Sequence, residues 1–178
     1  VDSMGAPTAC ESEGVPNVSY NGSTQQACPN TFIVSSRIDW APYFEHAIDC
    51  VKNGKDIEKY WTGNLSTGSV VLTDVNTQAA AEGTQEAINA AKAKLESGEI
   101  HVFDTSTFTV TVADNKNVNA KVDADGHLTS YMADVDTDEA YTPDTEAVSD
   151  GYFHESEFRS APYFDIQIDG ITLLDTKF

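Results

Sequence analysis

The fold is decided by the stretch Asp39-Trp-Ala-Pro-Tyr-Phe-Glu-His-Ala-Ile-Asp-Cys-Val-Lys-Asn-Gly54. Asp39 can accept a hydrogen bond from the first free amides of a helix as its N-cap, and Gly54 supplies the stop at the other end. The apolar residues of the stretch share one face at helical spacing, and they are Phe44, Ala47, Ile48 and Val51. We therefore expect an amphipathic helix whose apolar face covers a sheet.

Around this stretch, helix and strand signals alternate over the first hundred residues, which is typical of a sheet with covering helices. The expected strands are the end of one at 1–3, followed by 15–20, 31–35, 70–72 and 101–103. The further expected helices are 7–13 and 84–97, the second closed by Gly98. The sequence thus predicts an α/β fold for residues 1–104.

From residue 105 the pattern changes to alternating apolar residues. We expect a β-hairpin or small meander built from 108–112 and 118–122, with a third strand near 128–132. Lysine and arginine are absent between Lys121 and Arg159, so a solvated acidic loop is expected there. Residues 163–174 are apolar enough to dock back as strands. Residues 105–178 are therefore predicted to form a β-rich acidic extension.

Length and charge narrow the classes of function. The 178 residues suffice for one good-sized domain or a small pair. The formal charge of −19 comes from 29 acidic and 10 basic residues, and it repels nucleic-acid phosphates and anionic membranes. Apolar runs fall short of the roughly 18 to 20 residues that span a bilayer. Because the sequence starts at Val1 without a hydrophobic signal core, we interpret it as a fragment or processed product whose signal lies upstream.

Cysteine and histidine spacing gives no metal motif. Three cysteines leave at least one unpaired, and both a Cys10–Cys28 disulfide and three separate thiols fit the sequence. The four histidines form no H-x-x-x-H pair, so a zinc site would require residues to meet in space. The acidic run 134–138 imitates the start of a calcium loop, but its sixth and twelfth positions are wrong. We expect no metal and no cofactor.

Catalytic motifs are also lacking. The sequence contains neither a G-x-S-x-G nucleophile elbow nor a G-x-x-x-x-G-K-[ST] phosphate loop. Abundant carboxylates leave a glycosidase pair open as an alternative. The prediction is that this chain is not an enzyme.

Polar and aromatic residues gather at the predicted strand ends, and ligands of open α/β sheets bind outside the carboxyl ends of strands. The candidate ligand-binding residues are Asp2, Ser3, Asn21, Trp40 and Tyr43. A carboxylate or amide can pair with sugar hydroxyls or ring nitrogens, and an indole can stack on a planar base. The alternative for each position is a cap, a turn residue or a core ring.

Several ordered segments resemble one family. They are Asp2-Ser-Met-Gly-Ala-Pro-Thr-Ala-Cys-Glu11, 15–21, Asp39-Trp-Ala-Pro-Tyr-Phe44, Tyr60-Trp-Thr-Gly63 and 90–103. Together they resemble the C-terminal lobe of the basic membrane protein (BMP) family, the solute-binding lipoproteins of ABC importers with a type I periplasmic-binding-protein fold. The tail over 150–165 is similar to an extension in some Gram-positive relatives.

This resemblance implies a purine nucleoside or nucleobase held between two lobes, of which residues 1–104 represent one incomplete lobe. It also implies ABC permease partners, an extracellular cell-surface location, and a membrane link only through a lipid anchor upstream. Relatives that bind nucleosides carry an aspartate where this chain has Asn21, and a lysine where Ser36 precedes Arg37. Both departures leave a nucleobase or another small ligand open.

The leading hypothesis is therefore a fragment of an extracellular solute-binding protein. One alternative is a receptor for a sugar or another small polar ligand, and a second is a cell-surface hydrolase or adhesion module. A lobe separated from its partner leaves a sheet edge unpaired, so we also expect a tendency to self-associate.

Overall fold

The computed structural model describes residues 4–113, 116–136, 138–155, 157–159 and 163–172. The expected strand end at 1–3, and with it Asp2 and Ser3, lies outside the described residues. Contacts divide the chain into two compact units. The first comprises residues 1–59 and 63–99, and the second comprises residues 60–62 and 100–178.

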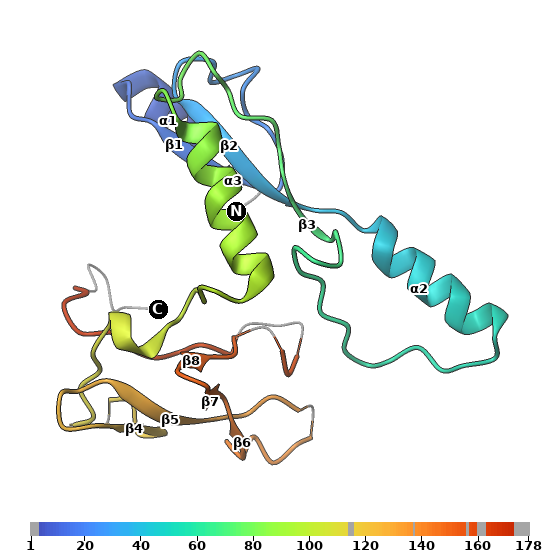
Figure 1. The fold of residues 1–178 in the computed structure, drawn as a ribbon, viewed down its shortest axis with the longest axis vertical. Helices are drawn as coiled ribbons and strands as arrows, with labels where there is room; N and C mark the ends of the chain where they lie inside the picture. The colour runs from blue at the N-terminus through green and yellow to red at the C-terminus, as the bar shows by residue number, and fades with distance from the viewer. Residues whose placement is uncertain (1–3, 114–115, 137, 156, 160–162, 173–178) are drawn as a thin grey trace. The chain divides into compact units, whose positions relative to one another are not determined.

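The first unit contains a three-stranded sheet in the order β1-β2-β3 (Figure 1). Its strands are β1 (Asn17–Tyr20), β2 (Phe32–Ile38) and β3 (Val70–Leu72). β1 runs parallel to β2, and β3 runs antiparallel to it. Phe32 and Ser35 of β2 are fully buried, so the central strand carries the core of this unit. The strands expected at 15–20, 31–35 and 70–72 are confirmed, with bounds that shift by up to three residues.

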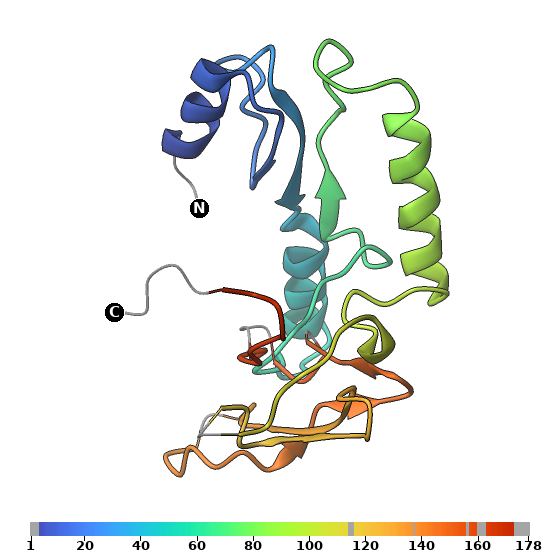
Figure 2. The same cartoon turned by 90° about the vertical axis from the view of Figure 1, so that its left-hand side faces the viewer.

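Three helices accompany this sheet, and they are α1 (Gly5–Glu13), α2 (Ala41–Lys52) and α3 (Thr84–Ser97). α1 and α3 lie on opposite sides of the sheet (Figure 2). The bounds of α3 match the expectation, and Gly98 closes it in the left-handed conformation with φ of 72°. All three expected helices are confirmed.

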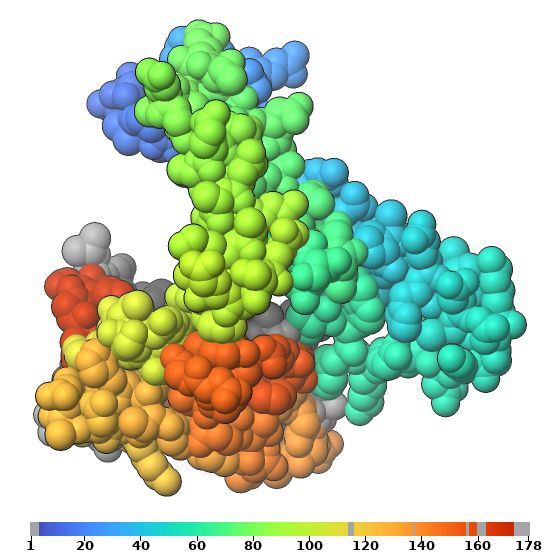
Figure 3. Space-filling view, in the orientation of Figure 1, coloured from blue at the N-terminus to red at the C-terminus, as the bar shows by residue number. Residues whose placement is uncertain are grey.

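The surroundings of α2 correct the sequence interpretation. Its apolar face was expected to cover the sheet, but Phe44, Ile48 and Val51 are 57%, 51% and 70% exposed. The helix extends beyond the carboxyl end of β2, and its atoms lie open on the visible face (Figures 1 and 3). Helical spacing determines which side chains share a face, but it does not determine what covers that face.

The start of α2 also differs from the expectation. The helix begins at Ala41 and has Trp40 in the N-cap position, one residue beyond Asp39. The Asp39 carboxylate still accepts a hydrogen bond from the Ala41 amide at 3.0 Å. Asp39 therefore performs the capping chemistry from outside the N-cap position.

The second unit is built from short antiparallel strands around its own core. The elements are η1 (Thr105–Thr107), β4 (Ala120–Val122), β5 (Leu128–Ala133), β6 (Thr145–Glu146), β7 (Val148–Ser149) and β8 (Tyr152–Phe153). One sheet has the order β4-β5-β6, and β7 pairs with β8. Phe153 is fully buried among Tyr131, Tyr163 and Phe164. A β-rich second part is thus present.

Three expectations for this unit are wrong. Residues 101–103 form turns, and 108–112 contribute one bridge between Val110 and Ile168 in place of a strand. The strands expected at 118–122 and 128–132 are confirmed as β4 and β5, which pair antiparallel around the Asp125-Gly126 turn. The acidic segment is not wholly a solvated loop, because it contains β6, β7 and β8 and buries Ala147. The many acidic residues of this segment dominated the sequence pattern, although a few apolar side chains determine how the segment packs.

Cys10, Cys28 and Cys50 are all free thiols, which favours the separate-thiol alternative. In the part of the chain that the structure describes, no helix has the length and apolar character to cross a membrane.

Candidate functional site

A hollow of about 680 Å³ lies in the first unit, bordered by α1, β1 and the loop that follows β1. Met4, Pro7 and Cys10 contribute to its wall from the side of α1. Its polar wall includes Asn17, Ser19 and Thr24. Mixed apolar and polar lining is the usual character of a small-molecule site. This hollow is the first candidate site.

The polar wall is held together by hydrogen bonds. The Ser19 hydroxyl donates to Asn17 Oδ1 at 3.1 Å and lies 3.3 Å from the Thr24 hydroxyl. The Asn17 amide in turn donates to Thr31 Oγ1 at 3.2 Å. Side chains connected in this way have fixed orientations, which favours selective recognition of a polar ligand.

Asn21 borders the hollow at the carboxyl end of β1. Its backbone amide donates to the Ser36 carbonyl of the parallel strand β2 at 2.6 Å. Its φ of 72° lies in the left-handed region, which asparagine tolerates better than most residues. The left-handed backbone of this turn therefore favours an asparagine, and the same residue borders the hollow.

Trp40 and Tyr43 are placed differently. Both lie at the start of α2, after the carboxyl end of β2, and neither borders the hollow that contains Asn21. Trp40 is 57% exposed, and its ring centroid is 6.4 Å from that of Phe44. The ring centroid of Tyr43 lies 5.9 Å from that of the same Phe44. Of the sequence-predicted residues that the structure describes, Asn21, Trp40 and Tyr43 all follow the carboxyl ends of strands, but only Asn21 borders the hollow.

Glu11 is a supporting residue that the sequence did not reveal. Its carboxylate accepts hydrogen bonds from the Thr31 hydroxyl at 2.7 Å and from the side-chain amide of Asn30. These donors, led by Thr31, hold the pKa of Glu11 below its usual value. Glu11 thereby ties α1, one wall of the hollow, to the residues that precede β2.

Asn76 supports the same region from the other side and was also missed. Its buried side-chain amide donates to the carbonyls of Pro29 and Phe32 at 2.8 Å each. Its Oδ1 accepts from Gln25 Nε2 at 3.1 Å. Asn76 is separated from Gln25, Pro29 and Phe32 by more than forty residues of chain, so no local sequence pattern signals these contacts.

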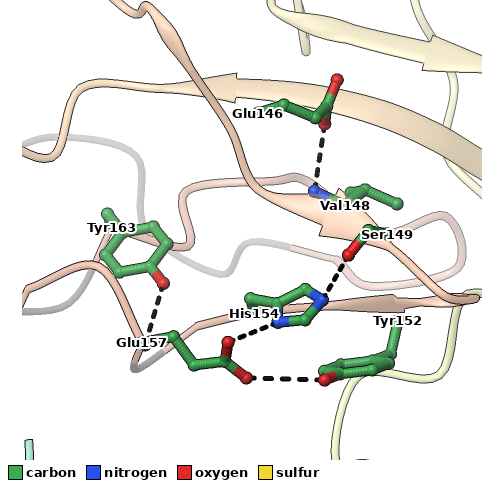
Figure 4. Close-up of polar contacts among 7 residues, drawn as sticks. All are labelled: Glu146, Val148, Ser149, Tyr152, His154, Glu157 and Tyr163. Carbon is green, nitrogen blue, oxygen red and sulfur yellow. Dashed lines mark hydrogen bonds and ion pairs between the residues drawn. The ribbon is translucent and has the colours of Figure 1, made fainter.

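A second polar array lies in the second unit, at the β7–β8 hairpin (Figure 4). The Ser149 hydroxyl lies 2.8 Å from His154 Nε2, and Glu157 Oε2 lies 2.7 Å from His154 Nδ1. His154 is buried, whereas Ser149 and Glu157 are exposed. These are the residue types of a nucleophile–base–carboxylate array, but the Nδ1 contact with Glu157 is an ion-pair distance without hydrogen-bond geometry.

Neighbouring rings fix the position of His154. The Tyr152 ring centroid lies 3.9 Å from that of His154, and the Tyr152 hydroxyl is directed toward Glu157 at 3.5 Å (Figure 4). The backbone amide of Glu157 donates to the Tyr163 hydroxyl at 3.3 Å. Burial, the first cause, and the acidic neighbours raise the pKa of Tyr152, so its phenol stays neutral and available as a donor.

No family model and no curated protein matches the chain. Among solved structures, the chain is similar to an ABC transporter solute-binding protein from Conexibacter woesei, with 19% identity and a TM-score of 0.43. The match covers 57% of this chain and 34% of that one, so the chain spans about a third of that protein's length.

Proposed function

We propose that residues 1–104 form part of a lobe of an extracellular solute-binding protein that captures a small polar ligand for an ABC importer. The carrying observation is the hollow beside the carboxyl end of β1, with Asn21 on its wall. Parallel β1 and β2 place Asn21 and Trp40 after strand ends on the same side of the sheet, where ligands of open α/β sheets bind. Residues 105–178 are an acidic β-rich extension of this lobe.

The ligand class that we propose is a purine nucleoside or nucleobase. The Asn21 side chain can both donate and accept hydrogen bonds, which suits ring nitrogens and exocyclic groups. The exposed Trp40 indole offers a flat surface on which a base can stack. The family resemblance of the sequence supports the same class. In the alternative function as a sugar receptor, the polar wall of the hollow would form hydrogen bonds with the sugar hydroxyls, and Trp40 would stack on the apolar face of the sugar ring.

Function in transport requires a second lobe. A ligand bound between two lobes stabilises the closed state in proportion to its differential affinity for that state, and the permease recognises it. In this proposal the chain supplies one wall, its permease partners lie at the membrane, and a lipid anchor upstream provides the membrane link. In this role the chain binds its ligand without covalent chemistry.

A thermal-shift screen of the chain against nucleosides, nucleobases and sugars tests this proposal. A true ligand at one hundred times its Kd should stabilise the folded state by about 2.7 kcal/mol. The shift should fall in an Asn21→Gly variant, which keeps the left-handed backbone and removes the amide. An Asn89→Ala change on α3 is the matched control. A screen in which sugars alone raise the midpoint selects the sugar receptor, and one without any shift contradicts the proposal.

A second function, hydrolysis of an ester or amide, is favoured by the Ser149–His154–Glu157 array. Ser149 Oγ would attack an acyl carbonyl while its proton passes to His154 Nε2, with Glu157 next to the other ring nitrogen. His154 would then give that proton to the departing alcohol or amine, and water would release the acyl group from Ser149. Labelling with a fluorophosphonate, followed by peptide mass spectrometry, tests this function. Label on Ser149 that is lost in His154→Gln and kept in Ser106→Ala supports it. Unlabelled Ser149 rules it out.

A further inference from the structure

We infer that His46, Cys50 and Glu58 form a binding site for a zinc-class transition metal. The Nε2, Sγ and carboxylate oxygen atoms of these three residues all lie within 4.8 Å of one another. They belong to the first unit, and none of them borders the hollow beside β1. The inference does not rest on the proposed function.

The local fold brings the three side chains together. His46 and Cys50 are separated by four residues on α2, so they occupy the same face of the helix. After the helix ends, Gly54 adopts φ of 64°, and the Lys55 amide donates to the Cys50 carbonyl at 2.9 Å. The chain thereby reverses and returns Glu58 to the helix, with Oε2 at 2.6 Å from His46 Nε2.

The distances suit a tetrahedral ion. Zinc bonds of about 2.3 Å to sulfur and about 2.0 Å to nitrogen or oxygen place neighbouring ligand atoms about 3.3 to 3.6 Å apart. Cys50 Sγ already lies 3.6 Å from His46 Nε2. The Glu58 oxygen, now hydrogen-bonded to Nε2, must withdraw by about 0.7 Å to meet the same geometry. Glu58 is an exposed side chain after the helix, so this adjustment requires only a rotamer change.

The contact pattern distinguishes a metal site from a catalytic relay. In a relay, one ring nitrogen faces the nucleophile and the other faces the carboxylate, as the nitrogens of His154 do (Figure 4). In the α2 cluster, a single nitrogen, His46 Nε2, faces both Cys50 Sγ and Glu58 Oε2. One nitrogen cannot serve a thiol and a carboxylate in a proton relay. Three ligand atoms that lie within 4.8 Å of one another match the arrangement that an ion requires.

The donor set indicates which ion is preferred. A thiolate, an imidazole and a carboxylate are all zinc ligands, and sulfur disfavours calcium and magnesium. Cys50 is buried, whereas the His46 and Glu58 side chains are 33% and 55% exposed. The thiol is therefore shielded, and the fourth position opens toward solvent, where water can bind. The net charge of −19 raises the local concentration of cations.

Cobalt(II) titration of the full chain under a non-thiol reductant tests the site. We expect a sulfur-to-cobalt charge-transfer band in the near ultraviolet and strong visible bands of four-coordinate cobalt, both displaced by zinc. Loss of a partner that only orients a ligand costs about 10- to 100-fold in affinity. Cys50→Ser, His46→Gln and Glu58→Gln should each raise the zinc Kd by at least about 100-fold, measured by chelator competition.

Cys10→Ser is the matched control, because Cys10 is a free thiol on a different helix. It should leave the spectrum and the Kd unchanged. Circular dichroism verifies that each variant is folded, and Glu58→Gln is the informative variant if Cys50→Ser unfolds. Cobalt that binds without a charge-transfer band overturns the inference, because surface carboxylates then hold it. A band that persists in Cys50→Ser, or an unchanged Kd in Glu58→Gln, also overturns it.

Discussion

The Glu11 carboxylate accepts a hydrogen bond from the Thr31 hydroxyl at 2.7 Å, which joins α1 to the residue before β2. The hydrogen bonds from Thr31 and Asn30 lower the pKa of Glu11 in the folded state, so the charged form of Glu11 stabilises the fold. That contribution is present above the usual value of 4.5 and is lost as the pH falls through the lower folded pKa. Glu11→Gln should therefore lower the unfolding midpoint at neutral pH.

The difference between the native chain and Glu11→Gln should shrink on acidification below pH 4.5, because protonation then makes the native side chain resemble glutamine. Thermal unfolding followed by circular dichroism over this range measures it. Glu13→Gln, on the same helix, is the control for removal of a negative charge from α1. A difference that stays constant with pH would contradict the role assigned to the Glu11 charge.

Removal of Asn76 should destabilise the first unit. Asn76→Ala leaves the Pro29 and Phe32 carbonyls without their side-chain donor in a buried setting. Leaving a buried polar group unsatisfied costs about 1 to 3 kcal/mol, and we expect a loss in this range. Urea denaturation measures it, and Asn89→Ala on α3 should change stability by less than about 0.5 kcal/mol. Equal effects of the two changes would show that the buried hydrogen bonds do not hold this region together.

The sequence predicted the helices well, because periodicity and caps are local signals. The bounds of α3 follow directly from Thr84, the lysines of its second half and Gly98. Short strands were harder to predict. β6, β7 and β8 have two residues each, and their pairing depends on partners elsewhere in the chain. No periodic signal can develop over two residues, so their acidic surroundings dominated the interpretation.

The candidate sites show the same limit more clearly. Asn21 could be predicted because it directly follows a strand, which is a topological rule. The contact between Asn76 and Phe32 spans forty-four residues, and only the fold creates it. His46 and Cys50 lie four residues apart, but Glu58 joins them through a turn that the spacing does not reveal. Sequence spacing can indicate ligand residues that lie on the same helix or strand. It does not indicate a ligand residue that a turn of the chain returns to that helix.

The exposed face of α2 leads to a prediction about stability. Val51 is 70% exposed, so Val51→Ser should change the free energy of unfolding by less than about 0.5 kcal/mol. Phe153 is fully buried in the second unit, so Phe153→Ala should cost about 3 to 5 kcal/mol. Chemical denaturation of both variants checks this contrast. A cost of 2 kcal/mol or more for Val51→Ser would mean that the α2 face is covered in solution.

Asn21 offers the sharpest test of ligand class. In nucleoside-binding members of the family that the sequence resembles, the corresponding residue is an aspartate that contacts the ribose, and the proposed ligand class makes this substitution informative. Asn21→Asp keeps the shape and suits the left-handed backbone, so the turn should survive. A carboxylate accepts hydrogen bonds from ribose hydroxyls more strongly than an amide does, by about 1 kcal/mol, or roughly fivefold in Kd.

Isothermal titration with a matched nucleoside and nucleobase pair measures the effect. In the native chain we expect the nucleobase to bind at least as well as its nucleoside, because Asn21 lacks the charge that favours ribose. In Asn21→Asp the ratio of affinities should move toward the nucleoside by about fivefold, with the nucleobase little changed. Equal changes in both affinities would show that Asn21 does not contact the ribose. The orientation of the ligand would then have to be explained by the exposed Trp40 ring.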